Sequence, residues 1–222
     1  GFPDALARIP LPALAAVVSA AAIGLVDIEA MRDLWRISRI ELMVAVTTAA
    51  VVVSFDVLVG VLVSVALSVA IAISRMTRPH DAVLGHAAHL DGWVDVAAYP
   101  DAVTEPGLVV YRFDAPLLFT NADRYATRVL DALRNQPGAE RWLVLDLEGV
   151  GSIDATAVVA LRRLVDDVQR EGVEVIAVAR ANHLTLDRLG RAGLLQPEGS
   201  LLVVPTINAA VRGFRASGGT AP

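Results

Sequence analysis

The distribution of apolar and charged residues divides the chain into two different parts. Residues 42–74 form a run of 33 residues in which Asp56 is the single ionisable side chain. A helix rises about 1.5 Å per residue and the bilayer core is about 30 Å thick, so such runs are typical of membrane spans. From about residue 80 onwards, short apolar runs alternate with amphipathic segments, as in water-exposed domains. The pattern predicts a membrane protein with a soluble C-terminal domain.

A shorter apolar run precedes the long one. Residues 9–26 carry no charge, and small side chains that favour close helix packing in membranes fill their second half. They predict a membrane helix, with a buried helix of a soluble core as the alternative. Residues 27–41 place Trp35 and other apolar side chains on one helical face and most Arg on the other. This segment predicts a short helix at the membrane interface, with a polar loop as the alternative.

Residues 42–74 are too many for one crossing. One straight helix would be about 50 Å long, and tilt does not easily absorb that excess. Arginines lie on both flanks, and the positive-inside rule places both flanks in the cytoplasm. We expect a helical hairpin that breaks near residues 54–56 or at Gly60, with one long tilted helix as the alternative. Asp56 then lies in a solvated turn; a buried carboxylate on an ion pathway is the alternative.

Strands and helices alternate in the second part. Residues 77–107 predict a linker, because Pro and Gly interrupt any period. The alternation after residue 108 predicts an α/β sheet with helices packed on it. The expected strands are residues 108–113, 116–120, 142–147, 173–179 and 201–204. The expected helices are residues 121–134, 154–171, 184–194 and 206–215, with Asn121, Asp154 and Thr206 as caps.

Charge separates the same two parts. Six Arg balance six Asp and Glu before about residue 80, whereas 13 Arg face 18 Asp and Glu after it, a difference of −5. An acidic soluble domain argues against nucleic-acid binding. The chain has no Cys, and His80, His86 and His89 have no acidic or Cys partner at ligand spacing. We therefore expect no metal and no cofactor.

The candidate for chemistry is the loop after the strand 142–147. Gly149, Gly151 and Ser152 lead into the helix that begins at Asp154, and helix N-termini can bind anions. The P-loop pattern is missing, and the chain contains no Lys. No nucleophile with its base and no paired carboxylates appear, which argues against an enzyme. Nucleotide binding by this loop stays open as an alternative.

LDLEGVGSIDATAVVAL, residues 145–161, resembles the signature loop and helix of STAS domains, in which an apolar strand and Asp precede I-D-S-[ST]-G. Residues 24–41 and 59–85 resemble the last membrane segments of SulP-type anion permeases. Residues 113–125 are similar to the start of the STAS domain in that family. The resemblance covers nearly the whole chain. It implies a multi-pass inner-membrane transporter of small anions such as sulfate or bicarbonate, with a cytoplasmic, regulatory STAS domain.

The resemblance also implies the domain organisation. Residues 1–76 correspond to the last transmembrane helices of the permease gate region, 77–107 to a linker, and 108–217 to the STAS domain. The anion-binding bundle of such permeases lies earlier, so we expect a C-terminal piece that does not transport alone. Expected partners are the lipid bilayer, the remainder of the membrane domain and a second copy in a homodimer. A membrane-tethered STAS module that signals by binding is the alternative.

The signature departs from the family at two positions. Ala155 stands where anti-sigma-factor antagonists carry a phosphorylated Ser, and Ala157 replaces the usual Gly. Because Ala155 cannot accept phosphate, we expect no switch of that kind there. Ser152, Asp154 and Thr156 form the candidate regulatory site, for an anion or a protein partner, with capping or packing as the alternative for the two hydroxyls. No substrate-binding residue can be assigned.

Overall fold

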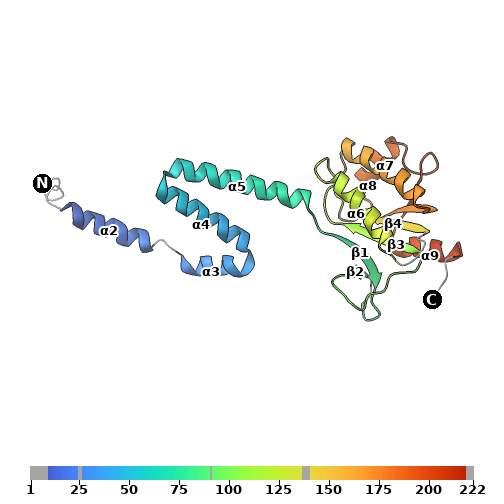
Figure 1. Ribbon diagram of the computed structural model, residues 1–222, viewed down its shortest axis with the longest axis horizontal. Helices are drawn as coiled ribbons and strands as arrows, with labels where there is room; N and C mark the ends of the chain where they lie inside the picture. Colours follow the sequence, from blue (N-terminus) through green and yellow to red (C-terminus); the bar gives the residue numbers. More distant parts are fainter. Residues whose placement is uncertain (1–9, 25–26, 91, 137–140, 219–222) are drawn as a thin grey trace. The chain divides into compact units, whose positions relative to one another are not determined.

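The computed structural model describes residues 10–24, 27–90, 92–136 and 141–218, and they fall into two compact units. The units are Gly1–Ala72 and Ile73–Pro222. Figure 1 shows helices in the first unit and a sheet covered by helices in the second. The first unit contains α2 (Leu11–Gly24), α3 (Ile28–Ile37), α4 (Arg39–Ser54) and most of α5 (Val57–Thr77). The predicted span 9–26 is α2, although residues 9, 25 and 26 lie outside the described residues.

Two polar caps fix the ends of α3. The Oδ1 atom of Asp27 accepts a hydrogen bond from the N–H of Ala30 at 2.9 Å and begins the helix. Ser38 leaves helical geometry, which ends α3, and its Oγ accepts from the N–H of Glu41 at the start of α4. The guanidinium of Arg39 lies 5.4 Å from the ring centroid of Trp35, a cation–π contact. Residues 28–37 are therefore helical, as predicted, and not a polar loop.

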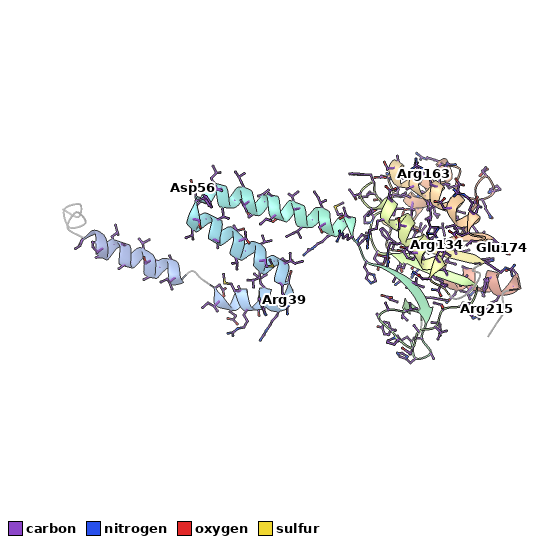
Figure 2. All side chains as sticks on the ribbon, in the orientation of Figure 1. Arg39, Asp56, Arg134, Arg163, Glu174 and Arg215 are labelled. Carbon is purple, nitrogen blue, oxygen red and sulfur yellow. The ribbon has the colours of Figure 1, made fainter. Side chains whose placement is uncertain are left out.

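The long apolar run is broken into two helices. α4 ends at Ser54 and α5 begins at Val57, so the break falls in the predicted interval. A Cβ atom on Gly60 would overlap the side chain of Val52, and glycine thus allows the two helices to approach closely. Asp56 is exposed at the turn between them (Figure 2). The predicted helical hairpin is confirmed, and the alternative of a single long helix is wrong.

Apolar side chains of the first unit point outward. By length and composition, two segments can cross a membrane: Val57–Thr77, and Pro12–Ile37, which includes residues 25 and 26 outside the described part of the chain. Helix α4, with 16 residues, is about 24 Å long and shorter than the bilayer core. Among the described residues before residue 73, Gly60 alone is buried. The first unit therefore has no interior of its own to hold its apolar side chains.

The second unit is built on a six-stranded sheet of order β2-β1-β3-β4-β5-β6. β1 pairs antiparallel with β2 and β3, whereas β3 to β6 are parallel. The strands are β1 (Asp81–His86), β2 (Trp93–Asp95), β3 (Leu108–Phe113), β4 (Trp142–Asp146), β5 (Val175–Ala179) and β6 (Leu201–Val204). The helices are α6 (Ala122–Arg134), α7 (Ala155–Arg170), α8 (His183–Arg191) and α9 (Ile207–Ala216). The predicted fold class, membrane-type helices before an α/β domain, is confirmed.

Each face of the sheet has its own apolar core. Helices α6, α7 and α8 pack on one face around Leu143 and Leu145, and α9 packs on the other around Val144 (Figure 1). Successive residues of a strand point to opposite faces, so the unbroken apolar run of β4 serves both cores. The ring of Trp142 in β4 and the ring of Phe214 in α9 meet edge to face.

The structure differs from the expectations in two segments. Residues 81–86 and 93–95, inside the expected linker 77–107, form β1 and β2. Their Pro-rich and Gly-rich surroundings hid these short strands, of which β1 pairs with both β2 and β3 and β2 forms the sheet edge. Residues 116–120 are not a strand: only Leu117 forms a bridge, to Ile153, because the chain turns directly into α6.

Asn121 does more than begin a helix. Its side chain makes no capping hydrogen bond to α6, contrary to the expectation. Instead its Nδ2 donates to the carbonyls of Met76 at 3.0 Å and Pro116 at 2.9 Å, while its Oδ1 accepts from the N–H of Leu118. The last turn of α5 is thus tied to the start of α6 by a buried amide.

Candidate functional site

The three candidate residues lie within one turn of each other at the start of α7. Asp154 caps the helix: its Oδ1 accepts from the N–H of Ala157 and its Oδ2 from the N–H of Phe119, both at 2.7 Å. Ser152 is half-buried and Thr156 is exposed. Both carboxylate oxygens of Asp154 are therefore engaged with the backbone, and the helix cap predicted from the sequence is confirmed.

The loop before α7 is fixed by neighbours on both sides. Leu117 exchanges backbone hydrogen bonds with Ser152 and Asp154, at 2.9 and 3.1 Å. On the other side, the amide of Asn182 donates to the carbonyls of Val150 and Gly151. The guanidinium of Arg188 donates to the carbonyl of Ile153. These contacts make the loop a rigid platform for the start of α7.

Gly149 has a packing role. A Cβ atom at this position would lie 2.7 Å from the Cα of Asp114 and 2.8 Å from the carbonyl oxygen of Phe113. The glycine therefore lets the loop approach the chain that leaves β3. Gly151, in contrast, faces open space. The close approach at Gly149 gives this glycine, but not Gly151, a structural reason that does not involve phosphate.

A groove opens beside the start of α7. Its volume is about 570 Å³, and it is lined by Asp154, Ala155, Val158, Arg188, Arg191 and Ala192. Because the carboxylate of Asp154 already occupies the positive end of the helix, a second anion there meets like charge. Large apolar side chains are exposed nearby on α7 and α8, at Val159 and Leu184. The groove thus combines two arginines and one engaged carboxylate with exposed apolar side chains on the same two helices.

A second cluster, missed by the sequence analysis, lies at the carboxyl ends of the central strands. Asp146 is fully buried, and its Oδ2 accepts from Nε of Arg112 at 2.8 Å. Its Oδ1 accepts from Nε of Arg180 at 2.9 Å, and Arg180 also pairs with Glu148. Burial opposes the charge of Arg180, but the hydrogen bonds and charge of Asp146 outweigh it and raise its pKa.

The sequence does hold a signal for this cluster. Arg112 and Asp146 lie at the ends of their strands, and Arg180 follows its strand directly. The carboxyl ends of neighbouring parallel strands meet at one edge of the sheet, so charged residues there converge. Opposite charges at the carboxyl ends of neighbouring strands are therefore the sequence pattern that indicates this cluster.

A third cluster joins β1, β3 and α6. Asp81 accepts a 2.6 Å hydrogen bond from the hydroxyl of Tyr111 and a 2.8 Å hydrogen bond from Nε of Arg128. Burial and the hydrogen bond to Asp81 raise the pKa of Tyr111, so this phenol stays protonated. The contacts tie the antiparallel strand β1 to its neighbour β3 and to helix α6.

Two of the three histidines in residues 80–89 have acidic neighbours in space. His80 lies 3.1 Å from Asp114 through Nδ1 and 3.5 Å from Asp95 through Nε2. His89 lies 2.8 Å from Asp101. The sequence analysis found no acidic partner, because these partners come from segments distant in sequence or from a turn. No cluster of three or more metal-ligating residues occurs among the described residues.

Comparisons with known proteins identify the chain. The STAS domain family matches residues 99–201. The chain is 41% identical over 95% of its length to the "Probable sulfate transporter" of Mycobacterium tuberculosis strain H37Rv, and covers 37% of that protein. It is 32% identical over 85% of its length to "Probable sulfate transporter 4.2" of Arabidopsis thaliana, covering 29% of it. The chain is homologous to sulfate transporters of the SulP family and contains their STAS domain.

The fold agrees with a solved structure of a related transporter. The murine Solute Carrier 26 family member A9 anion transporter in the inward-facing state aligns with a TM-score of 0.71 at 23% identity. The alignment covers 83% of this chain and 30% of that one. The chain thus spans about a third of the length of the curated relatives it matches. Its STAS domain holds all three candidate residues inside the matched range.

Proposed function

We propose that this chain is the C-terminal part of a SulP-type secondary transporter of a small anion such as sulfate. The supporting observation is one order of elements, apolar helices followed by a STAS domain, in a chain 41% identical to a protein named as a sulfate transporter. The chain acts as part of a membrane transporter and not as an enzyme. Residues 1–76 belong to the gate region, and the STAS domain extends upstream of residue 108, because β1 and β2 within 77–107 are strands of its sheet.

The chain by itself does not move anions. It covers 37% of the M. tuberculosis relative, so most of such a transporter would lie outside it. We expect no uptake of radiolabelled sulfate into liposomes that contain this polypeptide alone. A continuous reading frame upstream of Gly1, with many further apolar segments, should encode a protein that does take up sulfate. Uptake by the chain alone contradicts this part of the proposal.

The STAS domain faces the cytoplasm, and the turn at Asp56 faces the opposite side. Because the chain has no Cys, single cysteines can be placed without background. We expect a membrane-impermeant maleimide to label Asp56→Cys in intact cells and Glu198→Cys only in inside-out vesicles. Labelling of both positions from the same side contradicts the proposed orientation.

The start of α7 is the regulatory surface of the domain. Ala155 and Thr156 are exposed there, beside the half-buried Ser152, on a loop held rigidly by Asn182 and Leu117. We propose that Ser152, Asp154 and Thr156 contact a protein partner, which is the remaining membrane domain or a second copy of the chain in a homodimer. A large, charged side chain at this surface should disturb the contact without disturbing the core.

The test uses the upstream-extended protein in cells. Thr156→Arg should lower sulfate uptake severalfold at unchanged expression, whereas Thr127→Arg, on an exposed face of α6, should not. Equal uptake by both variants removes the start of α7 from the proposal. It leaves the assignment as part of a transporter intact.

A further inference from the structure

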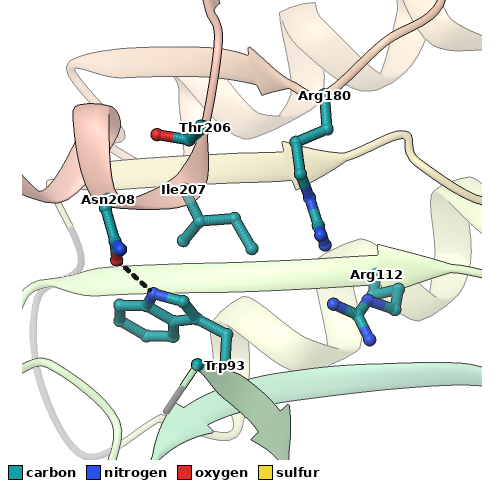
Figure 3. A pocket seen from close by; sticks show the side chains of 7 residues that line it. Trp93, Arg112, Arg180, Thr206, Ile207 and Asn208 are labelled. Atoms are coloured by element: carbon teal, nitrogen blue, oxygen red, sulfur yellow. Dashed lines mark hydrogen bonds between the residues drawn. The ribbon is translucent and has the colours of Figure 1, made fainter.

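A second pocket lies on the face of the STAS sheet that α9 covers, which is opposite to the face that carries α7. Its volume is about 360 Å³. Figure 3 shows its lining side chains: Trp93, Arg112, Arg180, Thr206, Ile207 and Asn208. The pocket gathers the carboxyl ends of β3, β5 and β6 and the start of α9. Ligands of α/β sheets bind at this edge.

Two arginines line the pocket, and its lining among the described residues contains no acidic side chain. Arg112 and Arg180 both pair with Asp146, and one carboxylate cannot neutralise two guanidinium groups. Glu148 also pairs with Arg180, but its side chain is 60% exposed and its charge is screened by water. Arg112 uses only its Nε for Asp146. Its two terminal nitrogens have no protein partner among the described residues.

The first turn of α9 also lines the pocket. Helix α9 has ten residues, and its N-terminal end carries the partial positive charge of the helix dipole. Thr206 caps α9 by accepting from the N–H of Ala209 at 3.1 Å, which leaves its hydroxyl hydrogen free to donate. The N–H groups of Ile207 and Asn208, in the first turn, have no acceptor within the described parts of the chain.

The walls of the pocket are held in place. The indole N–H of Trp93 donates to Oδ1 of Asn208 at 2.8 Å, which fixes the ring at one side (Figure 3). Arg180 adopts a left-handed backbone conformation with φ 55°, which is unfavourable for a residue with a side chain. Its guanidinium is nevertheless locked onto Asp146 by two donors. The cationic side of the pocket is therefore preorganised.

We propose that this pocket binds a small oxyanion such as sulfate or phosphate. The free terminal nitrogens of Arg112 form the planar fork that matches two oxygens of such an anion. The first-turn N–H groups of α9 and the hydroxyl of Thr206 supply neutral donors beside it. Asp146 and Asn208 act as positioning residues. This site lies on the other face of the sheet from Ser152, Asp154 and Thr156, and it goes beyond the proposed transport function.

The test observes the pocket directly in the full chain. The chain has three Trp, so a nitrogen-15-labelled sample in detergent micelles shows three indole N–H signals, and Trp93→Phe identifies one of them. Sodium sulfate, phosphate and acetate are titrated separately at constant ionic strength, balanced with sodium chloride. We expect saturating movement of the Trp93 signal with at least one of these oxyanions, while the signals of Trp35 and Trp142 stay in place. Acetate distinguishes a planar carboxylate from a tetrahedral ligand.

Two variants and a control decide whether the charge matters. Asn208→Asp keeps an oxygen that accepts from Trp93 and favours the helix start, but it adds a negative charge to the pocket. We expect it to weaken binding about tenfold or more, and Arg112→Gln to do the same. Arg134, at the end of α6, is exposed and pairs with Glu171. The control variant Arg134→Gln should bind the anion as the parent chain does.

Three results overturn the proposal. The first is a Trp93 signal that does not move at about 100 mM of any of the three anions, far above any useful affinity. The second is unchanged affinity in Asn208→Asp. The third is equal weakening by the control Arg134→Gln, which indicates screening of surface charge in place of a site.

Discussion

The helices of the first unit and the sheet of the second use the same kinds of side chain in opposite ways. Val53 in α4 is 88% exposed, whereas Leu143 and Val144 at the centre of the sheet are fully buried. Both regions are rich in Val, Leu, Ala and Ile. Burial of apolar surface stabilises a fold in water by about 25 cal/mol per Å². The first unit forgoes this stabilisation within itself, which is consistent with a lipid environment around it.

Polar groups complete the comparison. In the first unit they gather at helix ends and at the turn, as Asp27, Ser38 and Asp56 do. In the second unit charges are brought into the domain and paired there, as Asp146 is with two arginines. A helix satisfies its own backbone and needs no water, whereas a buried charge needs a partner. The two units therefore place their polar groups in different ways, as expected for one unit in lipid and one in water.

The largest predicted effect is a difference between two Leu→Ala substitutions. Leu143→Ala removes a fully buried side chain and should lower the free energy of unfolding of the STAS domain by about 3 kcal/mol. Leu62→Ala, on the outward face of α5, should change it by less than about 0.5 kcal/mol. Urea titration followed by Trp142 fluorescence in micelles measures both. Similar losses for the two variants contradict two separate environments.

The second prediction concerns the close approach of α4 and α5 at Gly60. Gly60→Val places a side chain against Val52 and should destabilise the hairpin by about 1–3 kcal/mol. Gly24→Val is the matched control, because no atom lies within 4 Å of a Cβ built at that helical glycine. Thermal loss of helical circular dichroism in micelles measures both variants. If they melt alike, α4 and α5 do not pack at Gly60.

A smaller effect is expected at the helix cap of the candidate site. Asp154→Ala removes acceptors from the N–H groups of Ala157 and Phe119 and should cost about 1–2 kcal/mol. Asp154→Asn keeps one acceptor and should cost less. Asp166→Ala, exposed on the same helix, is the control. Urea denaturation gives the comparison, and a neutral Asp154→Ala shows that the cap does not stabilise α7.

The smallest effect is a dependence on pH. The hydrogen bonds from Arg215, only partly opposed by burial, lower the pKa of Glu105 below 4.5. The folded domain thus binds this proton less readily than the unfolded chain. The stabilisation is full above pH 4.5 and is lost as pH falls through the lowered pKa. The free energy of unfolding, measured between pH 3 and 6, should decrease less steeply with falling pH in Glu105→Gln than in Glu198→Gln.

Local pattern predicted most of the fold. The break at residues 55–56, the cap at Asp154 and the strand 201–204 follow from apolar runs and polar caps, which are local properties. The strands β1 and β2 did not appear in the sequence pattern, because strands of three to six residues give a weak periodic signal and β1 depends on pairing with the distant β3.

The two clusters of candidate residues also differ in whether a local sequence pattern could predict them. Ser152, Asp154 and Thr156 are neighbours in sequence, so a motif could find them. Asp146 lies 34 residues after Arg112 and 34 residues before Arg180 along the chain. The three side chains meet only because β3, β4 and β5 are parallel neighbours in register. Strand order, and not any local motif, creates the second cluster.

The central claim, that the first unit lies in lipid and the second in water, is tested most directly by two single cysteines. Leu62 in α5 and Leu184 in α8 are almost equally exposed, at 62% and 67%. Their Cys variants are treated with a polar maleimide in open membrane fragments, in which both faces are accessible. Because the reactive thiolate requires water, Leu62→Cys should react at least about tenfold more slowly than Leu184→Cys, and detergent denaturation should remove the difference. Equal rates in the intact fragments would contradict the account.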